Sequence, residues 1–69
     1  MDGLEARLAL ANEYVAIGRL NIARQRRVIK TMASDGQETG SAQSLLDSFL
    51  ETQRLLTADR DRLLRELLA

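Results

Sequence analysis

Apolar side chains recur at alternating spacings of four and three residues through two long segments, and this pattern constrains the fold more than any other feature. In the first segment the spacing runs through Leu4, Leu8, Ala11, Val15, Gly18, Ile22, Gln25, Ile29 and Met32. In the second segment it runs through Ala42, Leu46, Phe49, Gln53, Leu56, Arg60, Leu63 and Leu67. A mean spacing of about 3.5 residues predicts two helices that pack along a coiled-coil seam.

The seam pattern is interrupted once, at residues 34–41, whose sequence SDGQETGS holds two of the four glycines. Gly36 suits the left-handed position that ends a helix, and Thr39 or Ser41 can cap the next helix with its hydroxyl oxygen. We therefore predict a helix over about 3–33, a loop over about 34–40 and a helix over about 41–68. Because the connection is short, we expect an antiparallel hairpin that forms one domain over residues 1–69.

Two layers of the seam break the apolar rule. We align the two seams about the predicted loop, so that the numbers of any two residues that face one another add up to about 78. In this register Gln25 faces Gln53, and Gly18 faces Arg60. We interpret the two glutamines as a hydrogen-bonded amide pair that fixes the register. We interpret the missing side chain of Gly18 as room for the long stem of Arg60 to cross the helix. We expect structural roles rather than ligand binding for these polar seam layers.

Both helices also carry large apolar residues beside the seam, and a lone hairpin would leave them in water. They are Leu10, Tyr14 and Ile17 on the first helix and Leu50, Leu64 and Leu68 on the second. A symmetric dimer, in which two hairpins form a four-helix bundle, is the simplest arrangement that buries them. The alternatives are a loose monomeric hairpin and a groove that receives an amphipathic helix of another protein.

The chain has no residue pattern for catalysis, for a cofactor or for a metal. It contains no histidine and no cysteine, so the commonest general base and metal ligand are missing, as is any thiolate. A di-iron bundle needs inward-facing carboxylates and Glu-x-x-His motifs. The seam positions of this chain hold apolar residues, glutamine or arginine, and none holds a carboxylate. The glycines of residues 34–41 follow a helix rather than a strand, which argues against a nucleotide-binding loop. We expect a protein that is not an enzyme.

Residues 19–30 carry four arginines and one lysine without an acid, although the whole chain has ten basic and ten acidic residues. On a helix, Arg19, Arg26 and Lys30 form one basic strip, and the other two arginines point elsewhere. This strip suits weak binding to nucleic acid or to an anionic surface, but no aromatic residues lie beside it for base stacking. We favour pairing of the strip with the acidic residues of segment 31–52, in the same hairpin or in a partner chain.

No apolar run approaches the roughly 18 residues of a membrane span, and acids stand near the N-terminus where a signal peptide has bases. We therefore expect a soluble, cytoplasmic protein. The sequence as a whole predicts a small protein–protein interaction module, a scaffold, adaptor or regulator, that acts as a homodimer. Weak nucleic-acid or anionic-surface binding through the basic strip is the alternative.

Four motifs of the chain resemble a family of short, uncharacterised helical proteins from alphaproteobacteria: IARQRRVI, DGQET, AQSLLDSFLETQRLL and DRDRLLREL. The matching positions are Ala23, Arg24, Gln25, Asp35, Gly36, Thr39, Ala42, Leu45, Leu46, Phe49, Thr52, Asp59 and Arg60. The resemblance covers about residues 18–67 and implies a small helical protein without an assigned activity. Where some members carry a histidine, this chain has Leu56, which argues against a role that needs an imidazole there.

Overall fold

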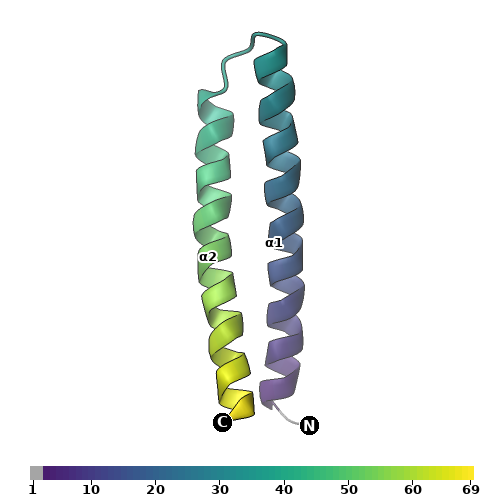
Figure 1. The fold of residues 1–69 in the computed structure, drawn as a ribbon, viewed down its shortest axis with the longest axis vertical. Helices are drawn as coiled ribbons and strands as arrows, with labels where there is room; N and C mark the ends of the chain where they lie inside the picture. The colour runs from purple at the N-terminus through teal and green to yellow at the C-terminus, as the bar shows by residue number, and fades with distance from the viewer. Residues whose placement is uncertain (1–2) are drawn as a thin grey trace.

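The computed structural model describes residues 3–69, and within this range the chain forms two α-helices and no strand. Helix α1 spans Gly3–Ser34 and helix α2 spans Gly40–Leu68. The helices run antiparallel and side by side, with the loop at one end and the start of α1 beside the end of α2 at the other (Figure 1). We call this second end the open end. The all-α prediction of two helices is confirmed, and the hairpin is a rod of 52 × 15 × 14 Å.

Helix α1 ends in a Schellman motif built on Gly36. This residue has a φ of 74°, in the left-handed region that glycine enters without strain. Its N–H donates to the carbonyl oxygen of Ala33 at 3.1 Å, and the N–H of Gln37 donates to the carbonyl oxygen of Met32 at 2.9 Å. These bonds satisfy two carbonyl groups that the end of the helix leaves without intrahelical partners. The predicted role of Gly36 is therefore confirmed.

Helix α2 begins with a different cap from the one that the sequence predicts. Thr39 occupies the N-cap position, but its hydroxyl makes no capping hydrogen bond, and Ser41 is already helical. The Oε1 atom of Glu38 instead accepts the N–H of Gly40 at 2.9 Å. The prediction of a hydroxyl cap is wrong, because a carboxylate reaches the free N–H and adds a negative charge where the helix dipole favours one.

The seam read from the sequence is the line of contact between the helices. Ala11, Val15, Ile22 and Gln25 of α1 are buried, as is Leu63 of α2. The other seam residues are half-buried, because in a hairpin each helix covers only one stripe of its neighbour. The prediction of the seam is confirmed.

The register between the helices differs from the prediction by one heptad. Gly18 lies opposite Gln53, so closely that a Cβ atom on Gly18 would lie 1.7 Å from Gln53 Oε1. Opposing residue numbers therefore sum to about 71 rather than about 78. The turn is tighter than the sequence suggested, because the chain folds back on the last turn of α1 through the Gly36 motif. A heptad shift leaves the same residues in the seam, so the apolar pattern alone fits both registers.

Each helix directs one glutamine to the backbone of the other. Gln25 Nε2 donates to the carbonyl oxygen of Ala42 at 2.9 Å, and Gln53 Nε2 donates to the carbonyl oxygen of Val15 at 2.9 Å. The predicted pairing of the two glutamines with one another is therefore wrong. Their bonds still tie the helices together at two heights, because a backbone carbonyl is an acceptor whose position the helix fixes.

The predicted layer of Arg60 and Gly18 is also wrong, because the amide of Gln53 fills the space that Gly18 leaves. Arg60 lies nearer the open end, where its Nε donates to Asp61 Oδ1 at 2.8 Å and its Nη1 to Asn12 Oδ1 at 3.4 Å. Its side chain is 23% exposed. The stem therefore covers the seam while the guanidinium reaches the surface, which is the behaviour that we expected of this residue.

Candidate functional site

A groove with a volume of about 310 Å³ lies midway along the hairpin, on one side of the seam. Its lining residues are Tyr14, Ile17, Gly18, Asn21, Phe49, Thr52, Gln53 and Leu56. The groove forms where Gly18, which has no side chain, and the shorter side chains of Asn21 and Thr52 lie between the chain's two aromatic residues, Tyr14 and Phe49. Apolar walls with a few polar groups are typical of binding sites.

A second groove of about 170 Å³ continues toward the open end, and Tyr14 lines both. Its lining residues are Arg7, Leu10, Ala11, Tyr14, Asp59 and Leu63. The two grooves therefore adjoin and share one side of the helix pair, which we call the groove face. Leu10 and Ile17 line it from α1, and Thr52 and Asp59 line it from α2.

The groove face extends beyond the two grooves by helical periodicity. Val28 comes seven residues after Asn21, Leu45 comes seven residues before Thr52, and Leu55 comes three residues after Thr52. Residues at these spacings lie on one side of a helix.

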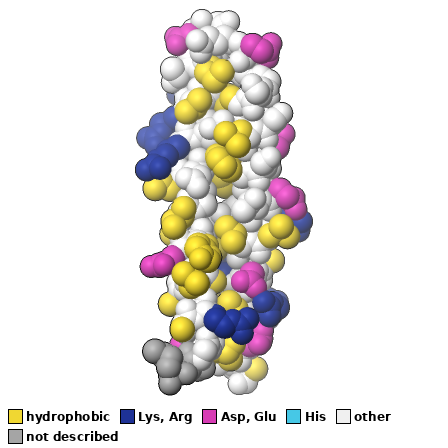
Figure 2. Space-filling model, turned by 180° about the vertical axis from the view of Figure 1, so that it is seen from behind, with side chains coloured by type: hydrophobic (Ala, Val, Ile, Leu, Met, Phe, Trp, Pro, Cys, Tyr) yellow, Lys and Arg dark blue, Asp and Glu magenta, His cyan; other side chains and the backbone are white. Residues whose placement is uncertain are grey.

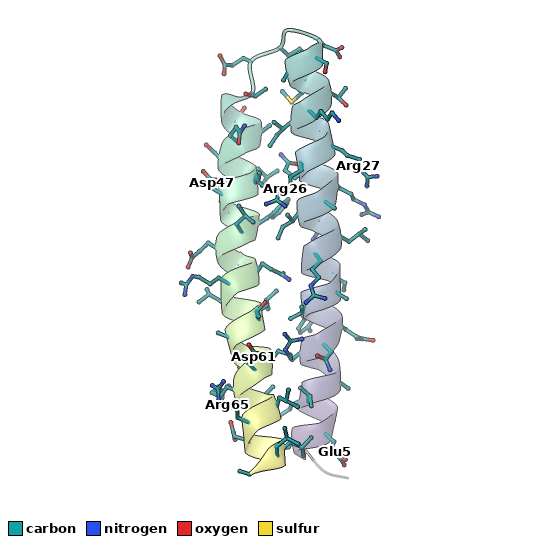
Figure 3. All side chains as sticks on the ribbon, in the orientation of Figure 1. Glu5, Arg26, Arg27, Asp47, Asp61 and Arg65 are labelled. Carbon is teal, nitrogen blue, oxygen red and sulfur yellow. The ribbon has the colours of Figure 1, made fainter. Side chains whose placement is uncertain are left out.

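The same face is visible in the space-filling view. The groove residues flank the seam on the side opposite to Arg26, which lies toward the viewer in Figure 3. Figure 2 is seen from behind, and there hydrophobic side chains run over both helices along most of the rod.

Six large hydrophobic residues of the groove face are about half exposed. Their exposed fractions are 47% for Leu10, 48% for Tyr14, 54% for Ile17, 47% for Val28, 46% for Leu45 and 55% for Leu55. Scattered single residues of this kind are normal on a protein surface, whereas a continuous patch marks a binding surface. The groove face is the strongest candidate for a functional site in the described residues.

The six residues that we predicted to form one interface lie on two different sides of the hairpin. Leu10, Tyr14 and Ile17 belong to the groove face. Leu50 and Leu64 each follow a seam residue by one position, whereas Thr52 and Asp59 each precede one. A step of one residue turns a helix by about 100°, so Leu50 and Leu64 flank the seam on the opposite side. Leu68, four residues after Leu64, lies with them and is 76% exposed.

The predicted interface therefore combines residues of two opposite faces. It does not include Val28, Leu45 or Leu55. The sequence signal that assigns a residue to the groove face is whether it comes directly before or directly after its nearest seam residue. In an antiparallel pair, residues that precede the seam on both helices share a face, as Tyr14 and Thr52 do here.

The base of the groove contains one unsatisfied polar atom. The Nε2 of Gln53 donates to Val15, but its Oε1 is buried without a hydrogen-bond donor among residues 3–69. A buried acceptor without a donor costs about 1–3 kcal/mol. The close approach of this oxygen to Gly18 makes glycine the residue that the position tolerates best.

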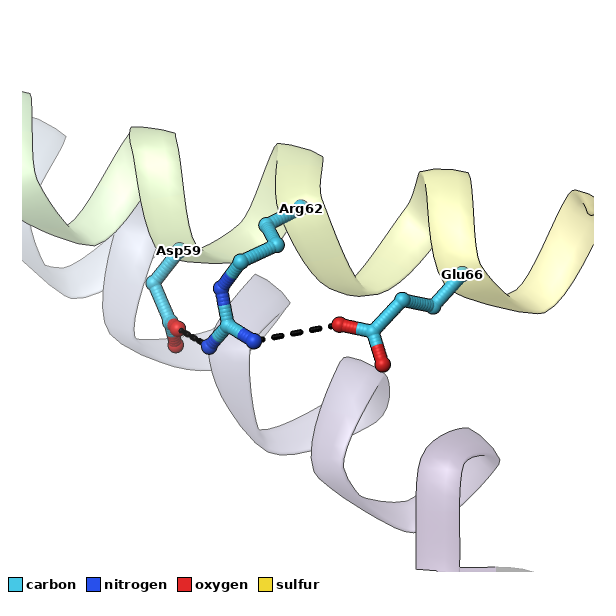
Figure 4. Close-up of polar contacts among 3 residues, drawn as sticks. All are labelled: Asp59, Arg62 and Glu66. Carbon is cyan, nitrogen blue, oxygen red and sulfur yellow. Dashed lines mark hydrogen bonds and ion pairs between the residues drawn. The ribbon is translucent and has the colours of Figure 1, made fainter.

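Every ion pair within residues 3–69 belongs to α2. Glu51 Oε2 lies 2.6 Å from Arg54 Nη2. Nearer the open end, Arg62 lies between Asp59 and Glu66 and bridges both carboxylates (Figure 4). These groups are about half exposed or more, so the pairs contribute little to stability. They do account for four acidic residues of α2, because arginines of the same helix hold Glu51, Asp59, Asp61 and Glu66.

These pairs shift the pKa values of the groups that form them. The hydrogen bond from Arg54, together with its positive charge, lowers the pKa of Glu51 below its ordinary value, and Glu51 raises the pKa of Arg54. The hydrogen bond to Asp59 and its charge raise the pKa of Arg62, with a smaller contribution from Glu66. All of these shifts favour the charged forms that the ion pairs need.

The basic strip forms no ion pair within residues 3–69. Arg19, Arg26 and Lys30 are exposed, and none of them belongs to an ion pair of the described residues. Figure 3 shows Arg26 on α1 and Asp47 on α2, and the two form no ion pair with one another. Glu51 is held by its own helix. The predicted neutralisation of the strip by segment 31–52 is therefore wrong inside one chain. Helix α1 carries six basic and two acidic residues over positions 3–34.

Positions 3–69 contain no cluster of three acidic side chains placed to hold a metal ion. Neither α1 nor α2 has a stretch that is long and apolar enough to cross a membrane.

The fold and the groove face thus define a small all-α hairpin with an apolar groove along one side. Comparison of the chain with protein-family models, with curated proteins and with solved structures finds no match. The resemblance to short alphaproteobacterial proteins stays a prediction.

Proposed function

We propose that the hairpin is a protein–protein interaction module without enzymatic activity, which acts as a homodimer through its groove face. The observation that carries this proposal is that six half-exposed large hydrophobic residues lie on the groove face, and that three of them line the two adjoining grooves. Burying each such side chain fully contributes about 1.5–3 kcal/mol relative to full exposure. Several of them on one continuous face are enough to hold two copies together in a four-helix bundle.

The surface area of the chain supports the same proposal. The hairpin exposes 5043 Å², whereas a compact monomer of this mass exposes about 4300 Å². The difference is about 700 Å², which is close to the roughly 800 Å² that each partner buries in a stable interface of standard size. A second copy on the groove face would bring the exposed area of each chain near that of an ordinary compact protein.

The experiment compares two aspartate variants that differ only in the face they alter. Ile17 lies on the groove face and is 54% exposed, whereas Leu20 lies on the outer side of α1 and is 48% exposed. We expect Ile17→Asp to weaken dimerisation about 100-fold or more, because each dimer loses two buried isoleucines and buries two carboxylates. Leu20→Asp should leave dimerisation unchanged.

Light scattering and analytical ultracentrifugation measure the mass, and circular dichroism checks that both variants remain helical. A folded wild-type monomer at micromolar concentration would contradict the homodimer. If both variants weaken dimerisation equally, the groove face is not the dimer interface.

A second candidate function is weak binding of nucleic acid or of an anionic surface by the basic strip. The observation that favours it is that Arg19, Arg26 and Lys30 form no ion pair with any other residue of the described range 3–69. Such binding should fall steeply with salt, because it depends on the release of counterions. Dimerisation through apolar side chains should persist. Fluorescence anisotropy of a short labelled RNA measures the binding by the wild-type protein and by a variant in which the three residues of the strip are replaced by glutamine. Loss of binding in the variant, without loss of dimerisation, assigns RNA binding to the strip.

We place this module in the cytoplasm and in the bacterial family that its motifs resemble. Support for the compartment comes from the lack of cysteine, which suits a reducing environment. Support for the family comes from the motifs of about residues 18–67. Within that resemblance Leu45 and Thr52 lie on the groove face, and the module would serve as a scaffold, adaptor or regulator.

A further inference from the structure

We infer that the side of the hairpin opposite to the groove face binds an acidic amphipathic helix of another protein. We call this side the strip face, because the basic strip of Arg19, Arg26 and Lys30 runs along it. The inference goes beyond the proposed homodimer, since it gives the hairpin a second interface that does not depend on the groove face. It follows from the apolar and basic residues that share this side.

The strip face is made of residues that directly follow a seam residue. Arg19, Arg26 and Lys30 do so on α1, and Leu50, Leu64 and Leu68 do so on α2. Residues that follow the seam on both helices of an antiparallel pair flank it on the same side, just as those that precede it share the groove face. The three leucines are exposed in the hairpin, and a second copy on the groove face would leave them uncovered.

Apolar residues of the two helices lie at similar heights along the strip face. Exposed alanines recur at every seventh position of α1, at Ala9, Ala16 and Ala23. Measured from the layer of Gly18, Ala9 and Leu64 lie about 13.5 and 16.5 Å toward the open end. Ala23 and Leu50 lie about 7.5 and 4.5 Å from that layer toward the loop. Because the side chain of alanine is a single methyl group, a third helix can approach the hairpin closely here.

Between the layer of Gly18 and the loop, the strip face carries more positive than negative charge. Arg19, Arg26 and Lys30 lie about 1.5, 12 and 18 Å from that layer, and none of them forms an ion pair within residues 3–69. The carboxylate of this part of the face is Asp47, which lies at about the height of Arg26 (Figure 3). Three cations and one carboxylate leave an excess of two positive charges.

Toward the open end, the charged residues of the strip face are Glu5, Arg54 and Asp61. Arg54 is held by Glu51, and Asp61 is held by Arg60. The exposed leucines Leu64 and Leu68 lie in this part of the face. The strip face therefore has an apolar half near the open end and a basic half near the loop.

An amphipathic helix with acidic residues beside its apolar stripe matches both halves. Its apolar side chains would pack on Leu50, Leu64 and the alanines, and its carboxylates would meet the basic strip. Arg19 and Arg26 are seven residues apart, as are the three alanines, and this is the repeat at which a packed helix presents its contacts. Opposite charges on the two surfaces favour association and select the partner. Such docking of a helix by its apolar side is a recurring mode of recognition.

Nucleic acid matches the strip face less well than an acidic helix does. The two aromatic residues of the chain, Tyr14 and Phe49, line the groove on the other side, so the strip face has none on which bases could stack. A phosphate backbone would also leave Leu50 and Leu64 without an apolar partner. The apolar residues of this face therefore favour a protein partner.

Two matched peptides test the inference. Each is a fluorescein-labelled helix of four heptads with leucine at both seam positions, and the positions beside the seam hold glutamate in one peptide and lysine in the other. Fluorescence anisotropy measures their affinity for the full chain. We expect the glutamate peptide to bind about 10-fold more tightly or better, because its carboxylates meet the basic strip. Equal binding of the two peptides, or no binding of the glutamate peptide, would overturn the inference.

Substitutions in the hairpin locate the bound peptide. We expect Arg26→Glu and Leu64→Asp each to weaken binding of the glutamate peptide about 10-fold or more. Their controls are Arg27→Glu and Leu20→Asp, which alter exposed residues of α1 outside both faces and should leave binding unchanged. Circular dichroism checks that all four variants remain helical. Weakening by the controls as large as that by Arg26→Glu and Leu64→Asp would overturn the placement on the strip face.

A variant of the groove face separates this inference from the proposed homodimer. Ile17→Asp should weaken dimerisation and leave binding of the glutamate peptide unchanged. If Ile17→Asp abolishes peptide binding, the peptide occupies the groove face and the inference is overturned. If the wild type is a monomer that still binds the peptide through Arg26 and Leu64, the homodimer alone is contradicted. A short labelled RNA that binds where the glutamate peptide does not would overturn the acidic helix and support the second candidate function.

Discussion

The backbone of Gly18 lies against the side-chain amide of Gln53. A Cβ atom on Gly18 would lie 1.7 Å from the Oε1 and 2.8 Å from the Cδ of Gln53. The amide can occupy this place and donate to the carbonyl of Val15 only because position 18 has no side chain. This contact sets the height at which the two helices meet and forms the base of the larger groove.

We expect the effect of Gly18→Ala on stability to change sign with the residue at position 53. In the wild-type chain the new methyl group overlaps the amide, and we expect a loss of about 1–2 kcal/mol in the free energy of unfolding. When Gln53 is first replaced by alanine, the overlap is gone and the better helix propensity of alanine should stabilise by about 0.5–1 kcal/mol. Urea titration of the four variants measures this coupling.

Gly3→Ala serves as the control for this cycle, because a Cβ atom there would meet nothing within 4 Å. Its effect should be small in both backgrounds. A destabilisation by Gly18→Ala that is the same with Gln53 and with Ala at position 53 would contradict the contact.

The register can be checked by nuclear Overhauser effects. We expect cross peaks between the Hα protons of Gly18 and the side chain of Gln53, and between the side-chain amide of Gln25 and the residues near Ala42, because both contacts are close in the hairpin. The side chains of Gln25 and Gln53 should share no cross peak, since they lie one heptad, or about 10 Å, apart along the rod. Cross peaks between these two amides would restore the alternative register.

Gly36 is expected to be the glycine whose replacement costs most outside the seam. Its φ of 74° is strained for any residue with a Cβ atom, so Gly36→Ala should lower the free energy of unfolding by about 1–2 kcal/mol. Gly36→Asn should cost less, because asparagine tolerates this region. Gly40→Ala is the matched control, since its Cβ atom would only approach the exposed carboxylate of Glu38 at 3.3 Å. Thermal unfolding of the three variants ranks them.

The pKa of Glu51 should rise toward its ordinary value when Arg54 is replaced by glutamine. In the hairpin the hydrogen bond and charge of Arg54 lower this pKa. The pair therefore stabilises the fold above the pKa of Glu51 in the unfolded chain, and this contribution is lost as pH falls through the lower pKa of the folded chain. Carbon-detected nuclear magnetic resonance titration measures both variants. If the titration of Glu51 is the same in both, the ion pair is absent in solution.

Much of the fold follows from patterns within a few turns of the chain. Leu63 and Val15 belong to a 4-3 repeat that two such helices bury between them. Gly36 can be predicted to end a helix, because this role depends only on its own φ and on hydrogen bonds of the neighbouring residues. The cap of α2 was harder to predict. Thr39 and Glu38 are adjacent, and which of them reaches the free N–H depends on the path of the loop.

The sequence by itself determined that the protein is two amphipathic helices joined by one tight turn, because helix propensity, periodicity and turn chemistry are local. It also supplied the seam and the unusual residues within it. The tertiary structure decided which of two heptad registers joins the helices, since a shift of seven residues preserves the seam. Contacts between particular residues, such as that of Gly18 with Gln53 and that of Gln25 with Ala42, distinguish the two. That register, with the handedness of an antiparallel pair, then decided that Tyr14 and Thr52 share a groove while Leu64 faces the other way.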